Sequence, residues 1–411
     1  MSVAGRLTRD GWLLFATRCS RMFAYGLLSV VLVLYLIEVG FKEWEVGLLL
    51  TLTLAGDTVI SLWLTTTADR LGRRRTLIVG AVLMALAGVA FVSTGNLFLL
   101  IVAATVGVIS PSGNEIGPFL SIEQASLAHV VSDERRTDVF AWYNLVGSFS
   151  TALGAFAGGL IAQASQYFGL SGAAVFRPVF LVYAVIGVAM IGGFALLSSA
   201  VEATKDEFKA PPRVFLGLHE SRWTVFKLSL LFALDAFGGG FVIQSIIAYW
   251  FQVRYQLDPA MLGTIFLFSN LLAGVSALAA GWLARRIGLV NTMVFTHLPS
   301  NVLLILVPLM PDVYWAVGLL LLRFSISQMD VPTRQAYTMA VVRPDERSAA
   351  AGITAVARSA GAVVSPMLAT VMVGTAGWMS VPFFLAGGLK IVYDVLLYRA
   401  FSSSQSRSEE K

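Results

Sequence analysis

The sequence has little charge and almost no cysteine. Asp, Glu, Lys and Arg make up 13 % of the 411 residues, about half of the roughly 25 % found in soluble globular domains. So few charges cannot cover a water-exposed surface of ordinary composition, which excludes a typical soluble enzyme. Cys19 is the single cysteine, so a disulfide framework and a multi-cysteine metal site are both excluded.

The motifs of several chemistries are also missing. The sequence contains no phosphate-binding G-x-x-x-x-G-K-[ST] loop, no H-E-x-x-H zinc motif and no nucleophile elbow. These absences argue against direct use of ATP and against hydrolase chemistry within this chain. We therefore expect no enzymatic activity, no cofactor and no metal site.

Long apolar runs dominate the sequence, and 57 % of the residues are hydrophobic. A helix that crosses a bilayer uses about 20 mostly apolar residues, so the chain is long enough for twelve crossings with short connections. The runs predict an all-α membrane protein. The twelve expected transmembrane helices lie near 13–37, 46–67, 76–95, 97–120, 139–163, 176–199, 224–251, 260–284, 290–309, 313–335, 349–373 and 378–399.

Positive charges fall mainly on one side of the predicted membrane. Of the 29 Lys and Arg residues, 21 lie in segments assigned to one side, and three (Lys42, Arg177 and Arg254) lie in segments assigned to the other. Because positive residues are retained in cytoplasmic loops, we expect both termini in the cytoplasm. We also expect the protein to be a monomer in the plasma membrane. The net charge of +5 therefore indicates the lipid bilayer as a partner, and not nucleic acid.

A polar stretch with a double proline, residues 201–223, divides the chain. It separates a predicted six-helix bundle over 1–200 from a second one over 224–401. A short polar tail follows at 402–411. We expect both the linker and the tail to be cytoplasmic.

The two halves repeat each other in sequence. ADRLG at 68–72 aligns with ARRIG at 284–288, and EQASLAHVVSDERRT at 123–137 aligns with RQAYTMAVVRPDERS at 334–348. The offsets of 216 and 211 residues are nearly equal, and the matches occur in the same order. Two parallel six-helix repeats are typical of transporters that bind their substrate between the halves near the bilayer midplane, so we expect a central cavity.

The most specific motif lies between the second and third predicted helices. T-x-x-x-D-R-L-G-R-R-R, from Thr65 to Arg75, resembles the G-x-x-x-D-R-x-G-R-R loop of the major facilitator superfamily. The resemblance covers nearly the whole chain and implies two six-helix bundles around a central cavity. In that family the loop latches the cytoplasmic side, which implies a gating role for Asp69, Arg70, Gly72 and Arg73. A positive anchor at the lipid headgroups is the alternative.

Two further stretches resemble particular transporter groups. G-A-F-A-G-G at 154–159 is similar to the G-P-x-x-G-G stretch of drug:proton antiporters, which favours efflux and implies close packing or a bend at Gly154, Gly158 and Gly159. The proline of that motif is absent here, whereas Pro366 occupies the matching position of the second half. The segment from Arg21 to Leu36 is similar to the first helix of proton-dependent oligopeptide transporters, with only the arginine of their E-x-x-E-R motif present.

Charged residues inside apolar helices are costly unless they are paired or hydrated, so they are candidates for the transport site. In the resembled family, helices one, four, seven and ten line the cavity. The spacing of Arg323, Ser327 and Asp330 places them on one face of helix ten, together with Arg334. The expected cavity residues are Arg18, Arg21, Tyr25, Glu115, Asp235, Arg323, Ser327 and Asp330.

Three buried carboxylates are candidates for proton coupling: Asp57, Glu115 and Asp235. Glu115 lies in the Pro- and Gly-rich segment 110–118, where it either pairs with an arginine of the first helix, carries a proton or contacts substrate. Asp235 precedes three glycines and either carries a proton or pairs with Arg358. The pKa of Asp57 depends on whether burial or a neighbouring arginine dominates.

Two other polar groups are interpreted as structural. Lys390 and Asp394 are spaced i, i+4 and are expected to form a self-contained pair. His297 is expected to be a helix-packing residue.

Together these observations predict a secondary transporter of a small organic solute that alternates access between the two sides of the membrane. Proton coupling and efflux are favoured. Uptake or facilitated diffusion of a small organic anion or zwitterion is the alternative, because Arg18 and Arg21 suit such a solute. An interpretation of another class is a transporter-like fold that serves as a membrane sensor or assembly factor without flux.

Overall fold

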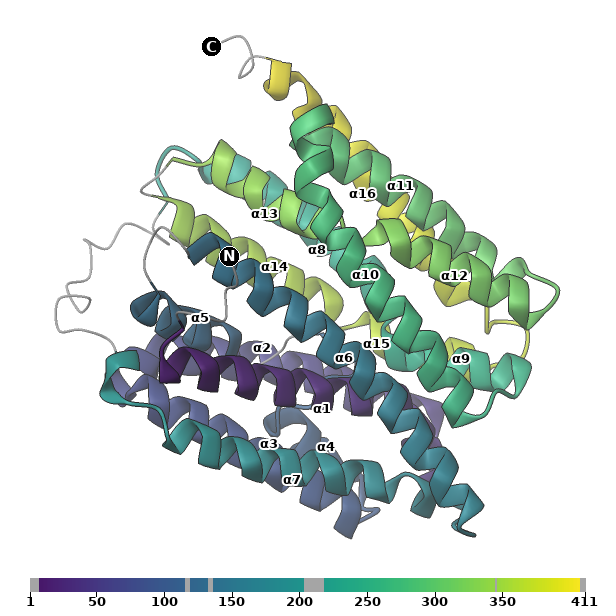
Figure 1. Cartoon of the computed structure of the whole chain (residues 1–411). Helices are drawn as coiled ribbons and strands as arrows, with labels where there is room; N and C mark the ends of the chain where they lie inside the picture. The colour runs from purple at the N-terminus through teal and green to yellow at the C-terminus, as the bar shows by residue number, and fades with distance from the viewer. Residues whose placement is uncertain (1–6, 115–118, 132–135, 203–217, 344–345, 407–411) are drawn as a thin grey trace. The chain divides into compact units, whose positions relative to one another are not determined.

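The computed structural model describes residues 7–114, 119–131, 136–202, 218–343 and 346–406. Within these ranges the chain is helical and contains no β-strand (Figure 1). The first half contains α1 (Arg9–Val39), α2 (Glu43–Leu71), α3 (Arg73–Ser93), α4 (Leu97–Val106), α5 (Phe119–Val130), α6 (Arg136–Tyr167) and α7 (Arg177–Ala195). The second half contains α8 (Arg222–Gly240), α9 (Gln244–Tyr255), α10 (Pro259–Ile287), α11 (Leu289–Leu306), α12 (Val313–Ser327), α13 (Asp330–Val341), α14 (Arg347–Ala362), α15 (Ser365–Gly374) and α16 (Val381–Ser406). Short 3₁₀ turns lie at Gly172–Val175, Ser199–Val201 and Val307–Leu309.

Ten helical stretches among the described residues are long and apolar enough to cross a membrane. Many of their large apolar side chains point outward: Leu86 is 60 % exposed, Leu230 64 % and Phe295 57 %. A surface of this kind is stable where lipid, and not water, surrounds it. The predicted all-α membrane fold is confirmed.

Four of the twelve predicted runs are not continuous. In the described part of the chain, the runs 97–120, 224–251, 313–335 and 349–373 each contain two helices. α4 ends at Val106, before Pro111 and Gly113. Gly113 has a φ of +70°, which is incompatible with an α-helix. α14 ends just before Pro366, which lies in the first turn of α15, where a missing N–H costs nothing. The prediction of one unbroken helix is therefore wrong at these four places, but Arg222–Tyr255 and Ala349–Gly374 are each long and apolar enough to cross the membrane as one stretch, as predicted.

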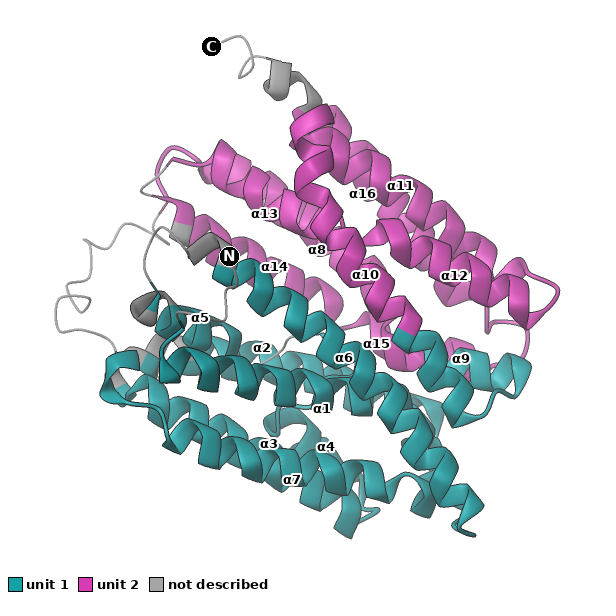
Figure 2. Cartoon of the chain, viewed as in Figure 1, with its two compact units in different colours: residues 1–210, 247–267 teal, residues 211–246, 268–411 magenta. Residues whose placement is uncertain are grey.

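The chain divides into two compact units (Figure 2). Unit 1 comprises 1–210 and 247–267, and unit 2 comprises 211–246 and 268–411. In unit 1, α1 packs along α6 and α3 along α7, while in unit 2 α8 packs on α14 and α11 on α16. The sequence assigned 247–267 to the second bundle, but this segment packs on α6: a Cβ on Gly159 would lie 2.2 Å from the carbonyl oxygen of Pro259.

Candidate functional site

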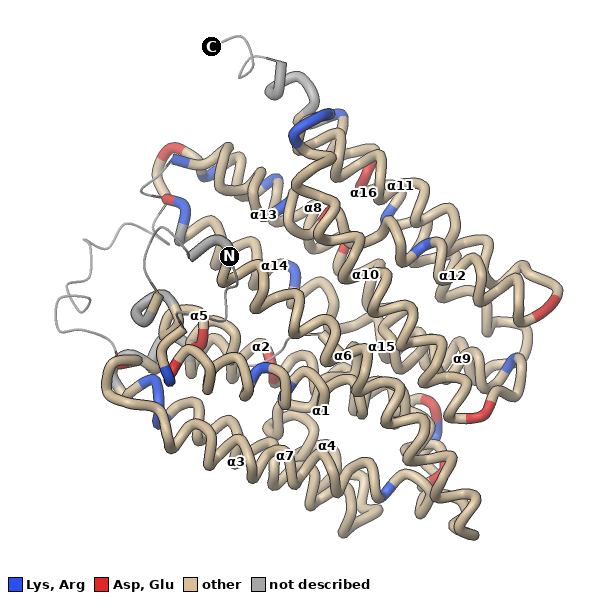
Figure 3. Tube along the Cα trace, viewed as in Figure 1, with Lys and Arg blue, Asp and Glu red and all other residues tan. Residues whose placement is uncertain are grey.

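The interior of unit 1 holds a charge cluster formed by α1, α5 and α6. Arg21 donates two hydrogen bonds to the Glu123 carboxylate, with Nη1–Oε1 at 2.6 Å and Nη2–Oε2 at 2.8 Å. Both side chains are fully buried. The hydroxyls of Tyr143 and Thr17 donate to the same carboxylate. Figure 3 shows how few charges lie along the middle of the helices.

Arg18 lies one turn before Arg21 on α1. Its Nε donates to the Tyr143 carbonyl at 2.8 Å and its Nη2 donates to Asn144 Oδ1 at 3.3 Å. α6 leaves room for this side chain at Gly147, where a Cβ would lie 2.8 Å from Nε. Two predicted cavity residues are thus held in place by α5 and α6.

The remaining site candidates of the first half are Tyr25, Asp57 and Glu115. Tyr25 is completely buried in α1. Asp57 is half-buried in α2 and accepts a hydrogen bond from Ser61 Oγ at 3.2 Å. Glu115 lies outside the described residues.

Unit 2 holds a second charge cluster, centred on Asp235 of α8. Lys390 Nζ on α16 donates to Asp235 Oδ1 at 2.6 Å, and Arg334 Nη1 on α13 donates to Oδ2 at 3.1 Å. Arg334 Nη1 also lies 3.1 Å from Asp330 Oδ2. All four side chains are at most 10 % exposed. One carboxylate therefore ties three helices of unit 2 together.

The unit-2 cluster continues outward to α11. His297 Nδ1 lies 2.8 Å from Asp394 Oδ1, and Asn301 Nδ2 donates to Asp394 Oδ2 at 3.0 Å. The His297 Nε2 atom faces Asp235 Oδ1 at 3.8 Å. Lys390 and Asp394 therefore do not form the predicted self-contained pair, because α8 and α11 offer each of them a closer partner. His297 likewise belongs to the ionic cluster and is more than a packing residue, and the closest cations of Asp235 are Lys390 and Arg334, not Arg358.

Arg323 and Ser327 lie one turn apart near the end of α12. They are 8 % and 4 % exposed. Neither Arg323 Nε nor Ser327 Oγ has a hydrogen-bond partner among the described residues. The predicted stripe from Arg323 to Arg334 is interrupted at Gln328 and Met329, where α12 ends and α13 begins.

The two clusters occupy matching places in the sequence repeat with their charges exchanged. Glu123 of α5 aligns with Arg334 of α13 at the offset of 211 found in the sequence, and Arg21 of α1 aligns with Asp235 of α8 at an offset of 214. Each half therefore pairs its first helix with its fourth through one buried ion pair. In the first half the cation is on the first helix, whereas in the second half the anion is.

The backbone around these pairs repeats as well. A Cβ on Gly26 would lie 2.2 Å from the Thr151 carbonyl oxygen, and one on Gly240 would lie 2.8 Å from the Ala362 carbonyl oxygen. Gly240 follows Gly26 by 214 residues, and Ala362 follows Thr151 by 211. The close approach of the first and fifth predicted helices is therefore built in the same way in both halves.

The predicted gating loop connects α2 and α3 in unit 1. Gly72 adopts φ +98° and Gly288, its counterpart in the repeat, adopts φ +85°, which explains the glycine at both positions. The Glu202 carboxylate accepts hydrogen bonds from the backbone N–H groups of Arg73 at 2.6 Å and Arg74 at 3.3 Å, at the N-terminus of α3, where an anion is favoured. The side chains of Asp69 and Arg70 lie outside the described part of the structure.

The predicted packing glycines lie against neighbouring backbones. A Cβ on Gly154 would lie 2.0 Å from the Phe23 carbonyl oxygen, and one on Gly158 would lie 2.6 Å from the Leu27 carbonyl oxygen. Gly159 faces α10 instead. Close helix packing therefore explains all three glycines, and α6 runs without a break through this segment.

A carboxylate that the sequence did not single out organises the start of unit 2. Glu346 accepts hydrogen bonds from the backbone N–H groups of His219, Glu220 and Ser221. Burial opposes ionisation, but hydrogen bonds from Ser221 and from these N–H groups outweigh it and lower the pKa of Glu346 to about 2. This contact fixes the α13–α14 connection to the start of α8.

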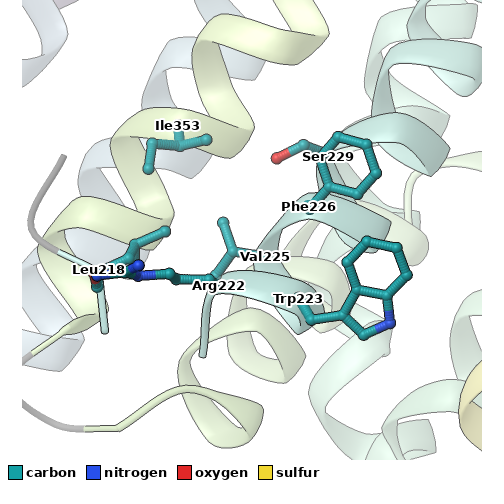
Figure 4. Close-up of a pocket in the computed structure, with 7 residues that line it drawn as sticks. All are labelled: Leu218, Arg222, Trp223, Val225, Phe226, Ser229 and Ile353. Carbon is teal, nitrogen blue, oxygen red and sulfur yellow. The ribbon is translucent and has the colours of Figure 1, made fainter. Parts of the chain in front are cut away.

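A cavity of about 460 Å³ lies at the beginning of α8 (Figure 4). It is lined by Leu218, Arg222, Trp223, Val225, Phe226, Ser229 and Ile353. Trp223 and Phe226 are 64 % and 56 % exposed, so this cavity opens on the outer, apolar surface of α8. None of its lining residues belongs to the unit-2 charge cluster.

Sequence reasoning missed Glu123, Lys390, His297 and Asp394 as members of the buried clusters. One signal could have found Glu123, because the repeat aligns it with Arg334, a charge already on the polar stripe. The contacts of His297 and Asp394 carry no such signal, since they depend on how α11 and α16 rotate against each other.

A bundle of long apolar helices with charges buried inside each unit defines an integral, multi-pass membrane protein. The family model described as Major Facilitator Superfamily matches residues 14–329. The chain belongs to this superfamily, and it is therefore a membrane transporter, as the sequence resemblance predicted.

Several proteins resemble the chain over nearly its full length. An uncharacterized membrane protein of Saccharomyces cerevisiae is 30 % identical over 420 residues, covering 95 % of this chain and 93 % of the yeast protein. The solved structure of the nucleoside transporter NupG matches with a TM-score of 0.72 at 13 % identity, covering 96 % of this chain and 99 % of NupG. A D-xylose–proton symporter matches with a TM-score of 0.73 at 13 % identity, covering 94 % and 97 %. At these identities the two solved structures show a shared fold alone.

Proposed function

We propose that this transporter is secondary active and coupled to protons, that it moves a small organic solute by alternating access, and that Asp235 takes up and releases the proton. The proposal includes a monomer in the plasma membrane with both termini in the cytoplasm. The uneven distribution of Lys and Arg between the predicted loops supports this orientation.

The placement of Asp235 carries the proposal. Lys390 and Arg334 contact its two oxygens from α16 and α13, so both cations depend on the charge of this carboxylate. A carboxylate that binds a proton no longer holds these cations, so protonation and the arrangement of α8, α13 and α16 are linked. Linkage of this kind lets a proton gradient bias one arrangement over another.

Two other carboxylates remain candidates for the same role. Asp57 lies in α2 beside Ser61, and Glu115, which lies outside the described residues, belongs to the Pro- and Gly-rich sequence 110–118. Asp235 is preferred because its oxygens join three helices, so that its proton occupancy acts on more than one element.

The direction of transport rests on sequence likeness. Similarity of 154–159 to drug:proton antiporters favours efflux, but the contacts of Gly154 and Gly158 with α1 explain these glycines by packing. We therefore confine the proposal to proton coupling. Proton-independent uptake or facilitated diffusion of a small organic anion or zwitterion is the second candidate, and it is favoured by the buried arginines of α1 and α12.

The loop after α2 is proposed to act as a cytoplasmic latch through Asp69, Arg70, Gly72 and Arg73. The capping of α3 by Glu202 supports this role, because it holds the loop in one defined conformation.

Proton coupling is tested in proteoliposomes that contain the pH dye pyranine. A panel of nucleosides, pentoses, monocarboxylates and cationic dyes is applied, and solute-driven proton movement is recorded. We expect at least one compound to move protons through the wild type. In Asp235→Asn the same compound should still exchange across the membrane, but it should move no protons and should not accumulate in response to a pH gradient.

Asp312→Asn provides the matched control. Asp312 caps the N-terminus of α12 at an exposed position, so its replacement should leave proton movement unchanged. Accumulation that responds equally to the pH gradient in Asp235→Asn and in the wild type would show that Asp235 does not couple protons.

A further inference from the structure

We infer that Arg323 and Ser327 form the binding site for the negatively charged group of the transported solute, which is a small organic monoanion such as a monocarboxylate. This inference rests on the proposed function, because it names the chemical class of the solute. It comes from two features of unit 2: unsatisfied buried donors and an excess of positive charge.

The unsatisfied donors are on one face of α12. Arg323 and Ser327 are spaced i, i+4 and are both more than nine-tenths buried. Arg323 Nε and Ser327 Oγ have no hydrogen-bond partner among the described residues. Buried donors without partners are destabilising, so proteins rarely keep them without a reason. An oxyanion that accepts from a guanidinium and a neighbouring hydroxyl would satisfy both.

The positive charge of unit 2 exceeds its negative charge around this site. The cations are Lys390, Arg334, Arg323 and Arg358, and the anions are Asp235, Asp330 and Asp394. Lys390 and Arg334 are paired with Asp235 and Asp330, and Asp394 contacts His297. In the described structure no carboxylate lies within ion-pairing distance of Arg323 or Arg358. The four cations outnumber the three carboxylates, so one positive charge is left unbalanced.

This imbalance selects the charge of the solute. A single anionic group balances the excess, whereas a cationic solute would add to it in a site of low dielectric constant. A neutral solute of the same shape would satisfy the donors with weaker, uncharged hydrogen bonds. We therefore expect discrimination by charge before discrimination by size.

Binding is measured on the purified full-length protein by thermal shift, because a ligand that prefers the folded state raises the apparent stability. The probes are benzoate with benzamide, lactate with lactamide, and benzenesulfonate with benzenesulfonamide, together with the cation benzylamine. We expect at least one anion to bind about ten-fold or more tightly than its uncharged partner. Arg323→Gln should abolish this preference, and Ser327→Ala should weaken binding of the same anion several-fold.

Two further variants separate the binding site from folding. Arg323→Lys keeps the charge and should retain a weakened preference for the anion. Arg399→Gln removes an exposed arginine outside both the cluster and the cavity at the start of α8 and should bind as the wild type does. The inference is overturned if each anion and its uncharged partner bind equally, or if Arg323→Gln keeps the preference. Because this assay needs neither flux nor a proton gradient, a negative result leaves proton coupling through Asp235 untouched, and loss of coupling leaves the anion preference untouched.

Discussion

The buried pair between Arg21 and Glu123 provides the sharpest test of the energetics of this fold. Both side chains are fully buried, and Nη1 lies 2.6 Å from Oε1. Replacing either residue alone leaves the other as a charge without its counter-ion in the interior of unit 1. We propose a double-mutant cycle with Arg21→Met, Glu123→Gln and the combined variant.

The expected magnitudes follow from burial. Removing one partner of a buried ion pair costs about 3–5 kcal/mol, because the remaining charge stays desolvated. At roughly 2–4 °C per kcal/mol for a unit of this size, each single variant should lower the thermal midpoint by about 10 °C. In the double variant neither buried charge remains, so the loss should be much smaller than the sum of the two single losses.

An exposed pair of equal length is the matched control. Arg343 Nη1 lies 2.6 Å from Glu220 Oε2, but these side chains are 52 % and 67 % exposed. Solvent screening limits such a pair to about 0–1 kcal/mol, so Arg343→Gln should change the midpoint by a few degrees at most. The reasoning is refuted if Glu123→Gln is no more damaging than Arg343→Gln, or if the single losses are simply additive.

Two further predictions concern packing and pH. Gly154→Ala would set a Cβ 2.0 Å from the Phe23 carbonyl oxygen and should destabilise the protein by about 1–3 kcal/mol, whereas Gly192→Ala, which meets nothing within 4 Å, should be neutral or stabilising in the same thermal assay. Glu346 has a pKa of about 2 in the folded chain against an ordinary value of 4.5, so its stabilisation is present above pH 4.5 and is lost as the pH falls toward 2. The wild-type midpoint should therefore fall more steeply than that of Glu346→Gln on acidification, and parallel profiles would contradict this.

The sequence was sufficient to predict the membrane class, the superfamily and the repeat, because these depend on composition, spacing and local motifs. The positive φ of Gly72 and Gly288 could be anticipated in the same way, since a glycine at the same place in two repeats marks one local conformation.

The buried clusters were harder to predict. The i, i+4 spacing of Lys390 and Asp394 is a local signal that predicts a pair within one helix. In the structure, Lys390 instead contacts Asp235 of α8, and Asp394 contacts His297 of α11. Glu123 was placed beyond the end of a membrane helix, because the polar, proline-containing sequence before it ends the apolar run. Tertiary contacts of this kind depend on how whole helices rotate and pack, and the apolar periodicity of a single helix does not predict them.

The exchanged polarity of the two matching ion pairs has a consequence for how the chain assembles. Duplicated halves with similar helices are prone to dock with the wrong copy while they fold. If α1 packed against α13 in place of α5, Arg21 would meet Arg334, and if α8 packed against α5, Asp235 would meet Glu123. Like charges brought together away from water repel strongly. The exchanged polarity therefore disfavours packing between helices of different halves during folding and favours packing within each half.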